Sequence, residues 1–384
     1  MDFSLTDEQV MLRNMAREFA ERYIEPTARE DDQKEHFPWE TVKKLGPLGL
    51  LGPIVPQEYG GLGLDYISYA MVTEEIAHAS VSIAMSVFGA HTVVEQLIMM
   101  WGSEEQKRKY LPAMCKGEIF GCCALSESGA GVSVASITSK AEPVDSGWNL
   151  NDEKTFVING SVSNVALTFA KVTEDEERQG TGAFLVPRDV VGFFSSDLSA
   201  RNGLRAANIA NLNFKDCRIP QENLIGNIHD GSKMFKDALD AVNFTVAASC
   251  VGATQACIDA SVKYAEERSA FGRPISNFDM VQEMIADMIV GNEAARLLIY
   301  QAGDLKNRGL PYNKQLSMAR YLAPDVAVRG ASNAIQVHGA YGFGKEFPVE
   351  RYLRDVAEVA LYGGPPLIHK LAAARAAFTM SLTG

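Results

Sequence analysis

The chain lacks the residue patterns that mark several common classes of protein. Six cysteines are spread over 384 residues without a C-x-x-C pair, and six histidines form no H-x-x-x-H pattern. Neither a metal site nor a disulfide framework is therefore indicated, and the apolar surroundings of the cysteines predict buried, reduced thiols. The sequence also has no G-x-G-x-x-G, G-x-x-x-x-G-K-[ST] or G-x-S-x-G motif. A Rossmann dinucleotide site, a P-loop and a serine hydrolase are not supported.

An excess of positive charge is also absent. The formal net charge is −12 at pH 7, which repels polyanions, so we expect no nucleic-acid partner. No uninterrupted apolar run approaches the roughly 18 residues that cross a bilayer, and the N-terminus shows no basic, apolar leader. With 47% hydrophobic and 22% charged residues the chain is not of the disordered class. We expect a globular, cytoplasmic protein with no membrane partner.

Three regions follow one another along the chain. Helical periodicity predicts helices near residues 4–25, 39–48, 66–80, 84–100 and 104–116, then near 231–268, 278–307, 313–339 and 348–359. The first helix has a candidate capping box at Thr6 and Gln9, and Pro26 is expected to end it. Between the two helical regions, short alternating runs such as 182–186 and 210–214 indicate strands. The pattern predicts an α+β protein with a helical domain over residues 1–117, a β-domain over 118–228 and a helical domain over 229–384.

Two motifs near the C-terminus resemble a known family. The run Gln336-Val-His-Gly-Ala-Tyr-Gly-Phe343 and the later run Val349-Glu-Arg-Tyr-Leu-Arg-Asp355 are similar to the Q-x-x-G-G-x-G and P-x-E-R-x-x-R-D motifs of the acyl-CoA dehydrogenase family. The resemblance covers nearly the whole chain. It implies an N-terminal helical domain, a middle β-domain, a C-terminal four-helix bundle, an FAD cofactor and an acyl-CoA substrate.

The resemblance also implies two groups of cofactor-binding residues. Ala124-Leu-Ser-Glu-Ser-Gly-Ala-Gly131 and Lys154-Thr-Phe-Val-Ile-Asn-Gly160 are similar to the family's flavin-ring segments. Glu267-Arg-Ser-Ala-Phe-Gly-Arg-Pro-Ile275 is similar to E-R-x-x-F-G-x-P-I, a segment that contacts the FAD of a neighbouring subunit. The expected FAD contacts are Leu125, Ser126, Gly131, Phe156, Ile158, Arg268, Phe271, Gln282, Gln336 and Gly339.

The departures from the family pattern cluster at the expected site of chemistry. The glutamate that removes the α-proton of the acyl-CoA is replaced by Gly363, and the second position known for such a base holds Val242. Asn243 stands for the usual arginine, and Ile158 stands for the threonine that hydrogen-bonds flavin N5. An isoleucine side chain makes no hydrogen bond. Further departures are Phe156 for tryptophan, Val132-Ser133 for Ser-Asp, and Gly364-Pro-Pro366 for G-T-[SAN].

A substitute base is one explanation. His91 and Glu95 lie one helical turn apart on a helix that the resemblance brings near the acyl end; the alternative reading is a solvent-facing or helix-packing pair. Met85, Phe156, Ile158 and Val242 would make the pocket apolar, which suits a hydrophobic acyl or ring substrate.

Three functions fit the sequence. The first is an FAD-dependent oxidoreductase acting on an acyl-CoA or small hydrophobic substrate without the usual glutamate. The second is a flavin-dependent monooxygenase or hydroxylase, or a desulfinase-type lyase, of the same fold; Met85 stands near the place of the desulfinase arginine, which weakens that branch. The third is a non-catalytic subunit that shares an FAD site with an active paralogue. A homotetramer is expected, with an electron-transfer flavoprotein or a flavin reductase as redox partner.

Overall fold

The N-terminal third of the chain folds into helices. The structure, a computed structural model, describes residues 4–173 and 179–381. The predicted capping box is confirmed, because Thr6 and Gln9 exchange side-chain to backbone hydrogen bonds at the first helix. In chain order the elements are α1 (Asp7–Phe19), η1 (Ala20–Ile24), α2 (Glu25–Lys34), α3 (Trp39–Lys43), η2 (Gly46–Leu48), η3 (Gln57–Tyr59), α4 (Tyr66–Ala79), α5 (Val81–Ser86), η4 (Val87–His91), α6 (Thr92–Trp101) and α7 (Glu104–Cys115).

The expectation that Pro26 ends the first helix is wrong. The π-helix η1 follows α1, and the Glu25 N–H donates to the carbonyl of Ala20, five residues earlier. Pro26 then lies in the first turn of α2. A proline is tolerated there because the first N–H groups of a helix have no partner within the helix. The chain therefore stays helical as far as Lys34.

A second π-turn divides the helix expected near residues 84–100. The π-helix η4 separates α5 from α6 and ends at His91. By length and composition, Val81–Trp101 and Gly231–Glu267 could each cross a membrane, but 89% and 94% of their most apolar windows are buried inside the protein. Such burial is what the core helices of a globular fold show.

The predicted β-domain follows α7. Its strands are β1 (Gly121–Ala124), β2 (Lys140–Val144), β3 (Gly147–Ile158), β4 (Val165–Thr173), β5 (Gln179–Pro187), β6 (Phe193–Asp197), β7 (Ile209–Pro220) and β8 (Leu224–Ile225). They form one sheet in the order β6-β7-β3-β2-β4-β5-β8, with β1 parallel to β4. The runs expected to be strands lie in β5 and β7. Alternate buried side chains such as Trp148, Leu150 and Phe184 form a separate core for the sheet.

The C-terminal part is helical again. Its elements are α8 (Gly231–Glu267), the hairpin β9 (Ser269–Ala270) and β10 (Arg273–Pro274), η7 (Ile275–Asn277), α9 (Asp279–Asn307), α10 (Asn313–His338), η8 (Gly339–Phe343), α11 (Val349–Val359) and α12 (Pro366–Ser381). The sequence patterns predict no helix beyond residue 359, so they missed α12. It begins at Pro366, where proline is compatible with a first turn.

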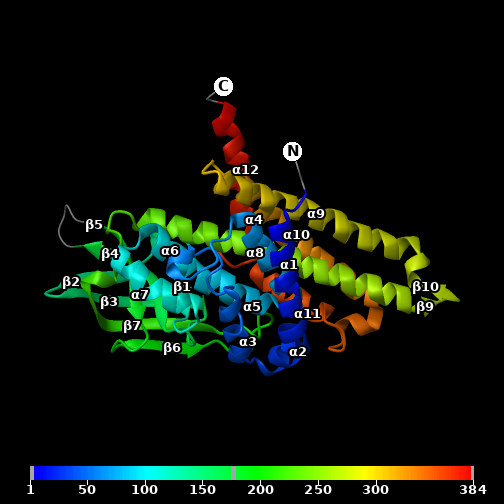
Figure 1. Ribbon diagram of the computed structural model, residues 1–384, viewed down its shortest axis with the longest axis horizontal. Coiled ribbons are helices and arrows are strands. Elements are labelled where there is room, and N and C mark those ends of the chain that lie inside the picture. Colours follow the sequence, from blue (N-terminus) through cyan, green and yellow to red (C-terminus); the bar gives the residue numbers. More distant parts are fainter. Residues whose placement is uncertain (1–3, 174–178, 382–384) are drawn as a thin grey trace.

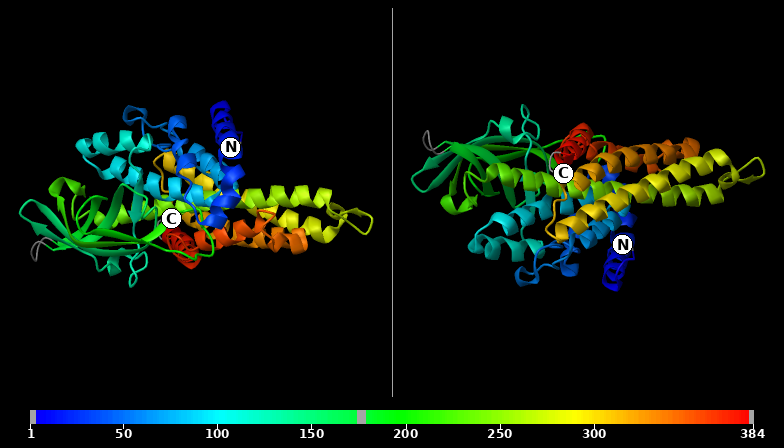
Figure 2. Two further views of the ribbon diagram at one scale, coloured as in Figure 1. Left: turned by 90° about the horizontal axis from the view of Figure 1, so that it is seen from below. Right: turned by 90° about the horizontal axis from the view of Figure 1, so that it is seen from above.

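The long helix α8 joins the parts of the molecule. Its central residues are almost all buried, and it packs against α4 of the first region and against α9 and α10. The β-domain lies at one end of the molecule and the β9–β10 hairpin at the other, with the N-terminal helices over the middle of α8 (Figures 1 and 2). This arrangement places the loop after α11 between the β-domain and the helices.

Candidate active site

The loop after α11 carries the position of the missing glutamate. Gly363 has φ of +77°, a left-handed conformation that favours glycine. A Cβ atom built on Gly363 would lie 3.0 Å from Cγ1 of Val242 and 3.1 Å from Oδ1 of Asn243. Both expected base positions, 363 and 242, are therefore neighbours in space, and neither carries a proton acceptor. The next residue, Gly364, lies against Val132 of the β-domain.

A buried arginine holds this loop. Arg320 of α10 is fully buried, and its Nε donates to Oδ1 of Asn243 at 3.1 Å. Its Nη2 donates to three carbonyl oxygens, those of Ala360 (3.0 Å), Tyr362 (2.6 Å) and Gly364 (3.1 Å). Because four hydrogen bonds converge on one guanidinium, the position of the loop is set by α8 and α10. The sequence analysis did not single out Arg320.

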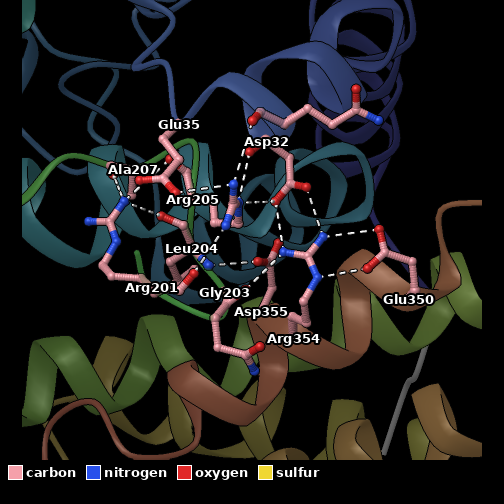
Figure 3. Close-up of polar contacts among 12 residues, drawn as sticks. Asp32, Glu35, Arg201, Gly203, Leu204, Arg205, Ala207, Glu350, Arg354 and Asp355 are labelled. Atoms are coloured by element: carbon pink, nitrogen blue, oxygen red, sulfur yellow. Dashed lines mark hydrogen bonds and ion pairs between the residues drawn. The ribbon is translucent and has the colours of Figure 1, made fainter. Parts of the chain in front are cut away.

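An ion network fixes α11, the helix that leads into the loop. Arg354 binds both carboxylate oxygens of Asp32 on α2 (3.0 and 2.8 Å) and both of Glu350 (3.1 and 2.7 Å) (Figure 3). Asp355 accepts a hydrogen bond from the backbone N–H of Leu204 in the β-domain at 2.7 Å. Burial raises the pKa of Asp355 to about 7. The E-R-Y-L-R-D motif thus ties all three regions together.

His91 and Glu95 pack inside the protein, so the solvent-facing reading is wrong. Both are fully buried, with His91 Nε2 3.6 Å from Glu95 Oε1. The Nδ1 atom of His91 accepts a hydrogen bond from the Gly121 N–H at 3.0 Å, and the ring stacks on Phe120. Burial lowers the pKa of His91 to about 4 and raises that of Glu95 well above its usual range. Both side chains therefore lie inside the protein, as the helix-packing alternative expects.

One group of predicted cofactor residues lies where the β-domain faces the helices. Leu125 is buried, Ser126 is half-buried and Gly131 is exposed. The Ser126 hydroxyl donates to the Thr155 carbonyl, and the Thr155 N–H donates to the Ser126 carbonyl at 2.9 Å. This pair of bonds places the 124–131 segment beside the end of β3.

The end of β3 carries Phe156 and Ile158. The pairing of β3 with β7 shifts register between Lys154 and Val157, and Phe156 has φ of +56°. This bulge turns the aromatic side chain outward, so that 65% of its surface is exposed. Ile158 is fully buried.

A buried ion cluster that the sequence analysis missed supports both segments. Lys154 on β3 donates to Glu127 (2.6 Å) and to the carbonyl of Phe169 (2.8 Å), and it lies 3.2 Å from Asp152. Burial alone would raise the pKa of Glu127, but bonds from Lys154 and Ser139 lower it to about 2. The sequence did contain a signal for this cluster, because Glu127 and Lys154 lie in the 124–131 and 154–160 segments that resemble the family's motifs.

The second group of predicted cofactor residues is exposed and lies away from the first. Arg268, Phe271 and Gln282 surround the β9–β10 hairpin, and Gln336 and Gly339 lie at the C-terminal end of α10. Phe271 is 96% exposed with φ of +52°, and no described residue forms an ion pair with Arg268. Gln282 Nε2 donates to the Ser276 carbonyl at 2.8 Å. Within one chain, the structure does not bring the two groups together.

Nearly the whole chain matches known proteins. It matches the models "Acyl-CoA dehydrogenase, N-terminal domain" over residues 6–118, "middle domain" over 122–217 and "C-terminal domain" over 229–378. An acyl-CoA dehydrogenase of Bacillus subtilis is 37% identical over 368 residues, which are 96% of this chain and 97% of that protein.

Two solved structures have the same fold. Butyryl-CoA dehydrogenase from Megasphaera elsdenii matches with a TM-score of 0.94 at 31% identity, covering 98% of this chain and 100% of the other. A glutaryl-CoA dehydrogenase from Mycobacterium smegmatis, in complex with FADH2, matches with a TM-score of 0.91 at 25% identity, covering 97% and 95%.

Fold and site together define a three-domain flavoprotein oxidoreductase. The chain belongs to the acyl-CoA dehydrogenase family, whose members are FAD-dependent oxidoreductases.

The described residues fit an FAD in two respects. An exposed guanidinium at Arg268 and an exposed ring at Phe271 offer a cation for a diphosphate and an apolar surface for an aromatic group. At Gly339, with φ of +58°, and at Gly131, no atom of the other described residues beyond the chain neighbours lies within 4 Å of a built Cβ, so a ligand can approach the backbone closely. Ile158, in contrast, supplies no hydrogen bond to a flavin ring.

Proposed function

We propose that the protein is an FAD-dependent oxidoreductase acting on an acyl-CoA thioester or another small hydrophobic substrate without a carboxylate base. The observation that carries this proposal is the contact between positions 363 and 242, which places a glycine and a valine where the family has its two alternative bases. Bound FAD would supply a two-electron acceptor for a hydride from the substrate. The residues of this chain would bind the ring (Leu125, Ser126, Gly131, Phe156, Ile158) and the diphosphate and adenine end (Arg268, Phe271, Gln282, Gln336, Gly339).

The surroundings of Gly363 support a non-standard chemistry. The nearest side chains to a Cβ built there are an alkyl group and an amide, and the amide oxygen accepts from the Arg320 guanidinium. None of these accepts a proton from an α-carbon. Loss of a positioned base typically costs about 10²–10⁴-fold in rate. The buried His91 packs against Phe120 and Gly121, and no contact among the described residues joins it or Glu95 to the 361–364 loop.

The first experiment is a flavin spectrum followed by an activity assay. We expect the purified protein to be yellow and to show negligible dye-coupled activity with butyryl-CoA, octanoyl-CoA and isovaleryl-CoA. Turnover above about 1 s⁻¹ with any of them would contradict the proposal. Substrate-dependent oxygen uptake by the flavin-reduced protein would instead favour the monooxygenase branch.

A non-catalytic subunit is the second candidate. It is favoured by the contrast between the two groups of cofactor residues: the Arg268 and Gln336 segments keep the family pattern, whereas the ring side has Phe156 and Ile158. A colourless protein that acquires flavin only with an added paralogue would support this candidate. We further propose a cytoplasmic homotetramer whose redox partner is an electron-transfer flavoprotein or a flavin reductase.

A further inference from the structure

A cavity lies where the N-terminal helices meet α8 and α11. It has a volume of about 380 Å³ and is bounded by α2, the end of α4, α8 and the 345–352 segment. This volume is within the range of small-ligand sites. Neither the 361–364 loop nor any of the expected FAD contacts lines it. More than half of the lining residues are charged, so the balance of paired and unpaired charges decides what the cavity can bind.

Two carboxylates of the cavity are bound by an arginine outside its lining. Asp32 and Glu350 each accept hydrogen bonds from Arg354 at both of their oxygens (Figure 3). A third carboxylate, Glu346, is exposed and forms no ion pair with a described residue. Because water and salt screen an exposed charge, Glu346 adds little to the field inside the cavity.

The other two carboxylates flank a histidine. Asp259 Oδ2 lies 3.0 Å from His78 Nε2, and Glu25 Oε1 lies 3.7 Å from His78 Nδ1. Burial alone would lower the pKa of His78, but the bonds to Asp259 and Glu25 raise it to about 9. The imidazole is therefore charged at neutral pH, and it offsets part of the negative charge of this pair.

The cations of the cavity have no such partners. Four of them converge from α2, α8, the turn before α11, and α11 itself, and no described residue forms an ion pair with any of the four: Arg29, Lys263, Lys345 and Arg351. The first three are exposed, as most surface cations are. Their gathering at one cavity is a local exception in a chain whose net charge is −12.

Arg351 differs from the other three because the protein holds its guanidinium in place. The residue is half-buried, and its Nη2 donates to the carbonyl of Ala79 at 3.2 Å. Its Nε is buried and has no hydrogen-bond partner among the described residues. Burial would lower the pKa of Arg351, but Tyr352 and Asp355 raise it, so the guanidinium keeps its charge. A fixed guanidinium with unused donors is suited to binding an oxyanion.

We propose that this cavity binds the phosphate or diphosphate group of a small molecule, with Arg351 as the fixed donor and the three exposed cations around it. The planar guanidinium matches phosphate oxygens, and the lysines add point charges. A ligand held from α2, α8 and α11 together would stabilise α11, the helix that leads into the 361–364 loop. The site is independent of the proposed function, because it contains none of the residues assigned to FAD or to the acyl group.

The test is isothermal titration of the purified FAD-containing protein with pyrophosphate, inorganic phosphate and ADP in a phosphate-free buffer. We expect pyrophosphate to bind with a dissociation constant below about 1 mM, and more weakly as KCl is added. In Arg351→Gln the constant should rise at least about tenfold, the effect of losing one charge-assisted hydrogen bond. Lys116→Gln, which removes an exposed cation outside the cavity, should leave the constant unchanged.

A double variant covers the case in which Arg351→Gln does not fold. Lys263 and Lys345 are exposed, so Lys263→Gln combined with Lys345→Gln should fold normally and still weaken pyrophosphate binding at least about tenfold. Tighter binding of ADP than of pyrophosphate would assign the phosphates to a nucleotide, and equal binding would assign them to a simple diphosphate. Either result supports the site.

Four results would overturn it. They are no binding of any probe at about 10 mM, unchanged binding in the arginine variant or in the double lysine variant, equal weakening in Lys116→Gln, and release of FAD as pyrophosphate is added. The third would reduce the effect to net charge. The last, seen as a rise in free-flavin fluorescence, would place the anion at the FAD site instead.

Discussion

At the scale of single residues, the site lacks a carboxylate at both positions where the resembled family has its base. Gly363 and Val242 leave the loop without a carboxylate, while Arg320 brings a guanidinium to the Asn243 side chain. The family resemblance marks the positions of Gly363 and Val242, so the sequence identified both. Arg320 lies in none of the motifs that carry the resemblance, so the sequence did not identify it. The role of Arg320 became visible only through the packing of α10 against the loop.

The backbone at Gly363 has a measurable consequence for stability. We expect Gly363→Ala to lower the free energy of unfolding by more than about 1–2 kcal/mol, because the left-handed φ alone costs that much and the new Cβ meets Val242 at 3.0 Å. Gly309→Ala is the matched control, because Gly309 has φ of +64° and its built Cβ meets no described residue beyond the chain neighbours within 4 Å. Urea unfolding followed by tryptophan fluorescence compares the two.

Equal destabilisation in the two variants would show that contact with Val242 does not matter. The same crowding bears on restoring the family's base. Gly363→Glu alone should give no dehydrogenase activity with butyryl-CoA, since its side chain starts in a strained position.

At the scale of elements, sequence patterns predicted the long helices and the β-domain well. Periodicity located α8, α9 and α10 to within a residue at nearly every end, because their apolar faces are continuous. Periodicity gave wrong helix boundaries near Pro26 and within residues 81–101. A π-turn lies close to each of these places, and no residue type in the sequence marks a π-turn.

The candidate site was predictable to a similar degree. Motifs identified the loop after α11 and the segments 124–131 and 154–160 as candidate parts of the site. They could not reveal the Glu127 and Lys154 cluster or the burial of His91, which depend on contacts between distant segments.

The ion network around α11 is expected to contribute to the free energy of unfolding, because it joins the three regions of the chain. We expect Arg354→Ala to destabilise the protein by about 3 kcal/mol, because it leaves the buried Asp32 carboxylate without its bidentate partner. Arg354→Lys should recover only part of the loss, since an ammonium cannot make two parallel bonds. Midpoints of urea unfolding at one protein concentration measure both changes.

Arg308→Ala serves as the control for this effect. It removes an exposed pair with Asp304 one helical turn away, and such pairs contribute about 0.5 kcal/mol or less. Comparable losses in Arg308→Ala and Arg354→Ala would mean that the network in Figure 3 adds nothing beyond ordinary surface charge.

At the scale of the whole molecule, the exposed surface supports the proposed homo-oligomer. Large apolar side chains are exposed along two helices, and the expected FAD contacts fall into two groups that one chain does not bring together. The exposed apolar residues are Met280, Ile289, Val290 and Leu297 on α9 and Leu367, Ile368, Leu371 and Phe378 on α12. Closed symmetry would cover such faces and join the ring side of one copy to the diphosphate side of another.

This arrangement predicts complementation between two defective variants. Phe156→Asp places a carboxylate on the exposed ring side at a left-handed position that aspartate tolerates, and Arg268→Ala removes the exposed guanidinium. Each variant alone should lose most of its FAD. In a mixed dimer, one of the two shared sites combines an unaltered ring side with an unaltered Arg268. Random mixing during co-expression should therefore restore about one quarter of the flavin content of the unaltered protein.

The measurement is the ratio of flavin to protein absorbance in the whole co-expressed population, purified through one affinity tag that both variants carry. Mixing the two variants after each has been purified and assembled is the control, and it should restore no flavin unless subunits exchange. A co-expressed sample as colourless as the separate variants would mean that each FAD site is built from one chain. The exposed Arg268 and Phe271 would then need another explanation, because no described residue of their own chain covers them.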